Sequence, residues 1–170
     1  MFEFLNMISS PKAIIIAAIF FAIAIPCWGS AKGVGIVGQA GAGLLSEDPD
    51  MFGKVLVLQA LPMTQGIYGF ITAFMVMLFT GIVGGSFMDP AFEITYVQAG
   101  YYFFACMPIA LIGYISAIHQ AKVSAAGVSM ISKQKKEVGK AMISSALVET
   151  YAIFSLLVSL LLIIFNGSLV

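Results

Sequence analysis

The chain has 170 residues, of which 61% are hydrophobic and 9% are charged, and its mean hydropathy is +1.04. Eight basic and eight acidic residues give a formal net charge of zero. This composition excludes a soluble globular domain and, without excess positive charge, a nucleic-acid-binding surface or a polybasic membrane anchor. We therefore expect an integral membrane protein whose partners are other proteins, membrane lipid and small ions, with no nucleic acid.

Long apolar segments follow one another along the chain, at residues 11–45, 51–83, 96–131 and 138–166. Each exceeds the roughly 20 residues that cross a bilayer as a helix. The alternating pattern typical of a membrane β-barrel does not occur in them. The sequence therefore predicts an all-α membrane protein with four transmembrane helices.

Lysine is unevenly distributed among the connections between these segments. The first connection, at 46–54, ends with Lys54, and the third, at 132–140, holds a cluster of lysines, whereas the second has none. Because lysine favours cytoplasmic loops, we expect 46–54 and 132–140 to be cytoplasmic and both termini to lie on the opposite side.

The two halves of the chain resemble each other. GSAKGVGIVGQAG near the end of the first segment parallels HQAKVSAAGVSM in the third, and QALPMTQGIYGF in the second parallels SALVETYAIFSL in the fourth. This repeat predicts two parallel helical hairpins, at residues 1–86 and 87–170. In this alignment Met63 stands opposite Glu149, so only the second hairpin places a carboxylate at this level.

Polar side chains are expected to share one depth in the membrane. Thr64 and Gln65 in the second segment, Gln120 in the third and Glu149 in the fourth all fall about 17 to 21 Å from the cytoplasmic helix ends at the helical rise. Hydrogen bonding between helices is enough to explain either glutamine. It explains Glu149 less well, because a charged side chain at mid-membrane costs at least roughly 2.5 kcal/mol.

The motifs LPMTQGIYGF, HQAKVSAAG and ALVETYA, in duplicated hairpins over nearly the whole chain, resemble the membrane rotor proteolipid of V-type ATPases. This proteolipid is the c-type subunit, also named subunit K, and the likeness is strongest to the bacterial sodium-translocating type. The resemblance implies a non-catalytic subunit of a bacterial cell membrane. It would form a rotor ring of identical subunits with stator and central-stalk partners, driven by ATP hydrolysis on other subunits.

The resemblance also implies which residues hold Na⁺. The implied ligands are Glu149, Gln120, Gln65, Thr64 and the carbonyl of Leu61, with Tyr68 hydrogen-bonded to the carboxylate. On chemical grounds, one carboxylate with neutral oxygens suits a hard cation. A proton needs only the carboxylate, so H⁺ remains an alternative cargo, and no organic cofactor is expected.

Two further hypotheses remain open from the residues. One is a small secondary cation transporter with Glu149 as its coupling carboxylate, and the other is a structural protein whose polar residues only fix helix packing. The glycine-rich first and third segments favour a tightly packed ring instead. The roles of His119, Lys32 and Lys122 are not assigned; for the two lysines, snorkelling toward the cytoplasm is favoured over pairing with Glu149.

Overall fold

The computed structural model describes residues 10–89, 91 and 93–165. The long helices in this part of the chain are α2 (Pro11–Glu47), α3 (Phe52–Ala60), α4 (Thr64–Phe79), α5 (Tyr96–Lys133) and α6 (Val138–Ile164). Short 3₁₀ turns are η1 (Pro49–Met51), η2 (Leu61–Met63) and η3 (Ser86–Met88).

Four of the helical stretches are long and apolar enough to cross a membrane, α3 and α4 together forming one of them. The prediction of an all-α protein with four transmembrane helices is confirmed. The predicted segment boundaries agree with the helices to within a few residues, and residue 166 of the last segment lies outside the described residues.

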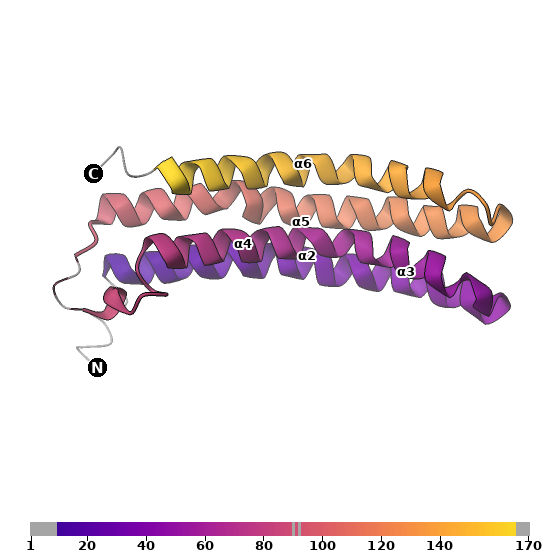
Figure 1. The fold of residues 1–170 in the computed structure, drawn as a ribbon, viewed down its shortest axis with the longest axis horizontal. Helices are drawn as coiled ribbons and strands as arrows, with labels where there is room; N and C mark the ends of the chain where they lie inside the picture. Colours follow the sequence, from indigo (N-terminus) through magenta and orange to yellow (C-terminus); the bar gives the residue numbers. More distant parts are fainter. Residues whose placement is uncertain (1–9, 90, 92, 166–170) are drawn as a thin grey trace.

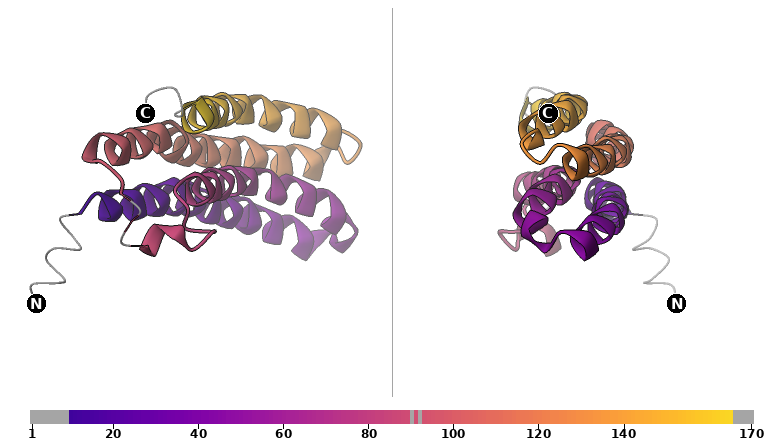
Figure 2. Two further views of the ribbon diagram at one scale, coloured as in Figure 1. Left: turned by 60° about the vertical axis from the view of Figure 1, so that its left-hand side comes forward. Right: turned by 90° about the vertical axis from the view of Figure 1, so that its right-hand side faces the viewer.

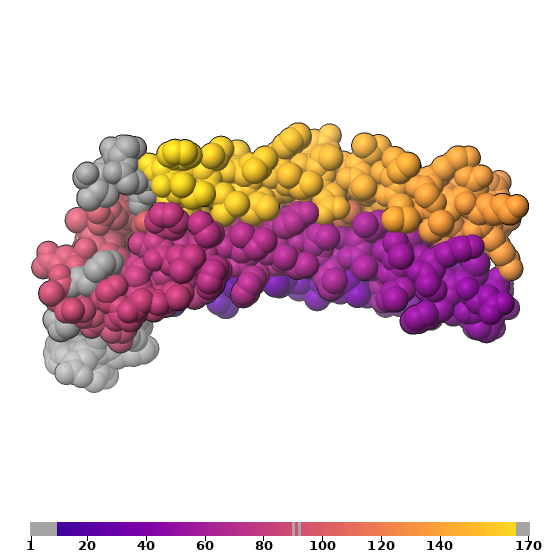
Figure 3. Space-filling view, viewed as in Figure 1, coloured from indigo at the N-terminus to yellow at the C-terminus, as the bar shows by residue number. Residues whose placement is uncertain are grey.

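The helices form an elongated, gently curved bundle (Figure 1). α2 and α5 contact each other along most of their length, α4 packs on α2, and α6 packs on α5. The end view shows the helices in cross-section (Figure 2), and α4 and α6 together cover one face of the molecule (Figure 3). The bundle is thus two hairpins joined mainly through α2 and α5.

The turns after α2 and α5 lie at the same end of the bundle. Lys135 forms an ion pair with Asp48, and Lys54 Nζ donates a hydrogen bond of 2.7 Å to the carbonyl of Lys135. The hydrogen bond and charge of Asp48 raise the pKa of Lys135 above its usual range. These contacts link the two connections that carry the lysines.

The apolar core is divided into two clusters, one toward each end of the bundle. The cluster near the start of α2 includes Ile15, Val76 and Ile163, and the cluster near the lysine-bearing turns includes Val37 and Ile131. Most of the buried polar side chains of α4, α5 and α6, Gln65 and Gln120 among them, lie in sequence between these clusters. The core therefore leaves a polar layer about midway along the bundle.

α4 approaches α2 closely at Gly69. Pro26 has no N–H, so the carbonyl of Ala22 loses its usual partner in the helix. A Cβ atom on Gly69 would lie 2.5 Å from this carbonyl oxygen and 2.9 Å from Cγ of Pro26. The absence of a side chain at Gly69 is what allows the two helices to meet there.

Gly69→Ala is expected to destabilise the protein by about 1–3 kcal/mol, because the added methyl group meets a backbone atom that cannot easily move. Gly43→Ala is the control, since a Cβ at Gly43 has nothing within 4 Å. Thermal unfolding in detergent should show a lower midpoint for Gly69→Ala and an unchanged or slightly higher one for Gly43→Ala. Equal midpoints would show that the close approach is not required.

Candidate ion-binding site

The second membrane-spanning helix changes its hydrogen-bonding pattern just before the polar layer. Pro62 cannot donate to the carbonyl of Leu58, and the chain tightens into the 3₁₀ turn η2. Thr64 Oγ1 donates a hydrogen bond of 3.0 Å to the carbonyl of Leu61. A hydroxyl and a carbonyl oxygen are therefore held side by side next to Gln65.

The carboxylate of Glu149 accepts hydrogen bonds from two other helices. Tyr68 Oη, on α4, donates to Oε1 at 2.6 Å, and Gln120 Nε2, on α5, donates to Oε2 at 3.3 Å. An ionised carboxylate accepts only, and a short O–H···O bond of this kind is typical of a charged acceptor. Both carboxylate oxygens of Glu149 are therefore held by neutral donors from neighbouring helices.

The hydrogen bonds continue away from the carboxylate through buried amides. Gln65 Nε2 donates to Gln120 Oε1 at 2.5 Å and to Ser116 Oγ at 3.4 Å, and Ser116 Oγ donates to the carbonyl of Val148 at 3.0 Å. Gln65 and Gln120 are both fully buried. Three helices are thus connected by one chain of polar side chains.

One oxygen in this chain lacks a donor. Gln65 Oε1 is buried and has no hydrogen-bond partner among the described residues. A buried acceptor without a partner costs about 1–3 kcal/mol. The site can therefore accept a further positive group at this oxygen.

Gln65, Gln120 and Glu149, which were predicted to share one depth, meet in one hydrogen-bonded chain, and Tyr68 joins it at the carboxylate. Thr64 and Leu61 bond to each other beside this chain.

Ser116 was not identified from the sequence. It lies one helical turn before Gln120, on the same face of α5, and this spacing is the signal that identifies it.

Lys32 does not pair with Glu149. Its Nζ lies 4.4 Å from the centre of the Trp28 ring and 3.4 Å from Tyr114 Oη. The charge of Glu149 is therefore not compensated by Lys32. His119, whose role was also left open, is exposed on α5.

The donor set favours a particular kind of ion. Among residues 10–89, 91 and 93–165, no three His, Cys, Asp or Glu side chains are grouped as they would be for a transition metal. One carboxylate, two amides, a hydroxyl and a carbonyl gather instead around α4, α5 and α6. Such neutral oxygens with a single negative charge suit a hard monovalent cation.

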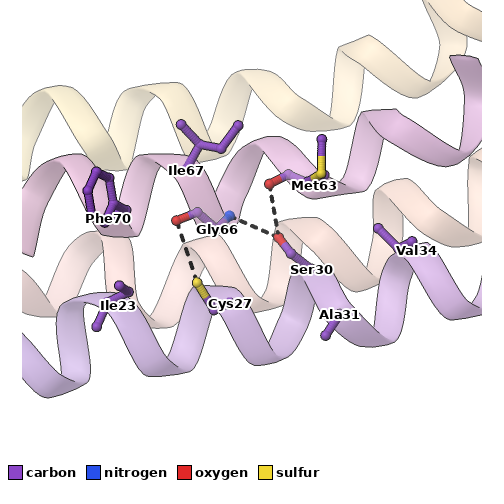
Figure 4. Close-up of a pocket in the computed structure, with 9 residues that line it drawn as sticks. All are labelled: Ile23, Cys27, Ser30, Ala31, Val34, Met63, Gly66, Ile67 and Phe70. Atoms are coloured by element: carbon purple, nitrogen blue, oxygen red, sulfur yellow. Dashed lines mark hydrogen bonds between the residues drawn. The ribbon is translucent and has the colours of Figure 1, made fainter.

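The corresponding place in the first hairpin has different chemistry (Figure 4). Ser30 Oγ accepts a hydrogen bond of 2.9 Å from the Gly66 N–H and donates one of 3.5 Å to the carbonyl of Met63. Cys27 Sγ lies 3.7 Å from the carbonyl of Gly66. These residues line a mostly apolar pocket of about 500 Å³, with Met63 where the second hairpin has Glu149.

Comparison with known proteins agrees with the duplicated fold. The profile of the ATP synthase C-subunit family matches twice, at residues 14–76 and 103–162. The V-type sodium ATPase subunit K of Enterococcus hirae is 39% identical over 159 residues, which cover 94% of this chain and 92% of that protein. The A-type ATP synthase subunit K of Methanocaldococcus jannaschii is 38% identical over 149 residues, covering 86% of this chain and 61% of that protein.

The two family matches fall one on each hairpin, and the similarity to both relatives extends over most of the chain. The chain therefore belongs to the ATP synthase C-subunit family, as a non-catalytic rotor proteolipid of a V- or A-type ATPase.

Proposed function

We propose that each copy of the chain binds one Na⁺ at mid-membrane and transports it as a ring of identical copies rotates past a stator subunit. ATP hydrolysis on other subunits drives the rotation through the central stalk. The ion is held by Glu149, Gln120, Gln65, Thr64 and the carbonyl of Leu61, and Tyr68 holds the carboxylate.

The observation that best supports a cation is the unpartnered oxygen of Gln65. Its neighbours Gln120 and Ser116 accept from its amide nitrogen, and Oε1 is left buried without a donor among the described residues. A bound cation supplies positive charge to this oxygen. A proton on Glu149 does not, because Gln120 separates Gln65 from the carboxylate in the hydrogen-bonded chain.

The charge of Glu149 also supports a bound cation. An ionised carboxylate in hydrocarbon is costly unless a positive charge lies beside it. The hydrogen bonds from Tyr68 and Gln120 are both donated by neutral groups, and Lys32 points to aromatic rings instead. A monovalent cation compensates the charge and leaves the site neutral.

The name of the Enterococcus hirae relative, a V-type sodium ATPase subunit, supports sodium as the cargo. We further propose that the protein lies in a bacterial cell membrane. The linked turns at 46–54 and 132–140 then face the cytoplasm, because their lysines favour that side.

Glu149→Gln is expected to abolish Na⁺ transport and leave the fold intact, because the amide has nearly the same shape but carries no compensating charge. Transport is measured as ATP-driven ²²Na⁺ uptake into vesicles containing the reconstituted complex. Uptake should fall to the level of vesicles without the complex. Glu137→Gln is the control and should keep full uptake, since Glu137 precedes α6 at the bundle end and pairs with Lys140. Full uptake by Glu149→Gln would contradict the assignment.

Sodium is expected to protect Glu149 from a carbodiimide, which reacts with protonated carboxyl groups. The labelling rate is followed across a Na⁺ titration at fixed pH. Gln65→Ala should raise the Na⁺ concentration for half-protection roughly 10- to 100-fold, because the cation loses a buried ligand. The glutamate itself stays reactive in this variant.

Gln59→Ala is the matched control for this titration. Gln59 donates to the carbonyl of Val34 at 3.4 Å and does not touch the polar chain, so its removal should leave half-protection unchanged. Wild-type labelling that does not respond to Na⁺ at any concentration would assign the site to protons.

A further inference from the structure

Ser30, on α2, contacts the two peptide groups that flank Thr64 and Gln65 (Figure 4). Its Oγ accepts the hydrogen bond of 2.9 Å from the Gly66 N–H, which belongs to the peptide group after Gln65. The same hydroxyl donates, at 3.5 Å, to the carbonyl of Met63, which belongs to the peptide group before Thr64. One side chain thus holds both ends of the dipeptide that carries two of the proposed ligands.

Holding the two peptide groups restricts the chain between them. Each peptide group is planar, so only the φ and ψ angles of Thr64 and Gln65 separate the two held planes. Ser30 and Gly66 are both buried, so water does not compete for these bonds. The Thr64 hydroxyl and the Gln65 amide therefore start from fixed backbone positions, and the former is bonded in turn to the carbonyl of Leu61.

The corresponding part of the second hairpin is built differently. Several aligned positions at this level change together: Pro62 aligns with Val148, Gly66 with Ala152 and Ser30 with Gln120. α6 runs through this level without interruption, whereas the second membrane-spanning helix is interrupted by η2. The proline, the glycine and the serine thus occur with the interrupted helix, as parts of one local arrangement.

The threonine hydrogen bond beside the site does not explain this difference. Thr150 Oγ1 donates to the carbonyl of Leu147 at 2.8 Å, just as Thr64 Oγ1 donates to the carbonyl of Leu61 at 3.0 Å. The same bond therefore occurs in a continuous helix and in an interrupted one. The contact with Ser30 is what accompanies the interruption.

Gly66 gives the Ser30 hydroxyl room to reach the backbone of α4. A Cβ atom on Gly66 would lie 3.3 Å from Ser30 Oγ and 3.4 Å from Ser30 Cβ. A side chain at this position would therefore press α2 and α4 apart and lengthen the hydrogen bond to the Gly66 N–H.

We infer that Ser30 is a positioning residue of the cation site, which fixes the spacing of the oxygens that Thr64, Gln65 and the turn at Leu61 supply. Ser30 is not itself a ligand, and it acts through the backbone of α4. Selectivity among hard cations depends on the size and flexibility of the cavity, so a fixed spacing favours one ionic radius. The inference rests on the proposed function and gives α2, which carries no proposed ligand, a part in it.

Ser30→Ala removes both hydrogen bonds with little change of shape. The carbodiimide titration of Glu149 is carried out on the assembled complex with Na⁺ and, separately, with the smaller Li⁺. The Na⁺ concentration for half-protection should rise about tenfold, because a buried N–H loses its partner and the chain shifts to satisfy it. The ratio of the Li⁺ concentration to the Na⁺ concentration should move toward one, because a site with freer ligands adapts to either ion.

Two further variants at the same position separate the hydroxyl from the packing. Ser30→Thr keeps the hydroxyl and adds a methyl group, for which the apolar pocket of about 500 Å³ beside Ser30 has room. This variant should keep the wild-type half-protection and the wild-type ratio. Ser30→Cys should give a smaller rise than Ser30→Ala, because a thiol is a weaker hydrogen-bonding group. It also provides the test if Ser30→Ala does not assemble.

Ser159→Ala is the matched control. Ser159 Oγ accepts a hydrogen bond of 3.3 Å from the Ile109 N–H, so it also joins the two helices of a hairpin through a buried backbone group. Ile109 lies 11 residues before Gln120, about 16 Å away along α5. Both alanine variants should lower the midpoint of thermal unfolding, but only Ser30→Ala should change the protecting concentrations of the ions.

The inference is overturned if neither Ser30→Ala nor Ser30→Cys raises the Na⁺ concentration for half-protection, or if the Li⁺ to Na⁺ ratio stays that of the wild type. It also fails if Ser30→Thr behaves like Ser30→Ala, or if Ser159→Ala weakens protection equally. In each of these cases, Na⁺ protection of Glu149 in the wild type shows that the proposed function still holds. A wild type that Na⁺ does not protect overturns both.

Discussion

The chain of hydrogen bonds from Tyr68 through Glu149 and Gln120 to Gln65 is the constraint on which the rest of the structure depends. Water does not reach hydrocarbon, so each of these groups must find its partner within the protein. The need for these hydrogen bonds fixes the positions of α4, α5 and α6 along the bundle relative to one another. The apolar clusters on either side tolerate the sliding of one helix along another far better, because apolar contacts are not directional.

Close helix packing makes that chain possible. Lipid tails are as apolar as leucine, so membrane helices associate through close contact rather than through the hydrophobic effect. Gly29 and Gly33 bring α2 against α5, and Gly69 brings α4 against the carbonyl freed by Pro26. These contacts hold α4 and α6 near enough for Tyr68 on α4 to reach Glu149 on α6.

The two hairpins have the same arrangement of helices but different side chains at the level of the site. Both hairpins place a polar group at the level of the site, but the first has Ser30 and Met63 where the second has Gln120 and Glu149. Ser30 satisfies the Gly66 N–H beside it and needs no ion, whereas Gln65 keeps an acceptor without a donor among the described residues. Glu149 is the one carboxylate at the depth of the site in the described membrane-spanning helices, which sets the proposed cargo at one cation per copy.

The sequence by itself determined the class of fold, because four apolar segments in a chain with few charges permit little else in a bilayer. It also determined the common depth of Gln65, Gln120 and Glu149, because helical rise is constant. Only the tertiary structure decided which side chains touch. The rotation of each helix about its own axis sets the direction in which its side chains point, and depth in the membrane does not. The bonds of Ser116 and the unpartnered oxygen of Gln65 depend on that rotation, as does the turning of Lys32 toward Trp28.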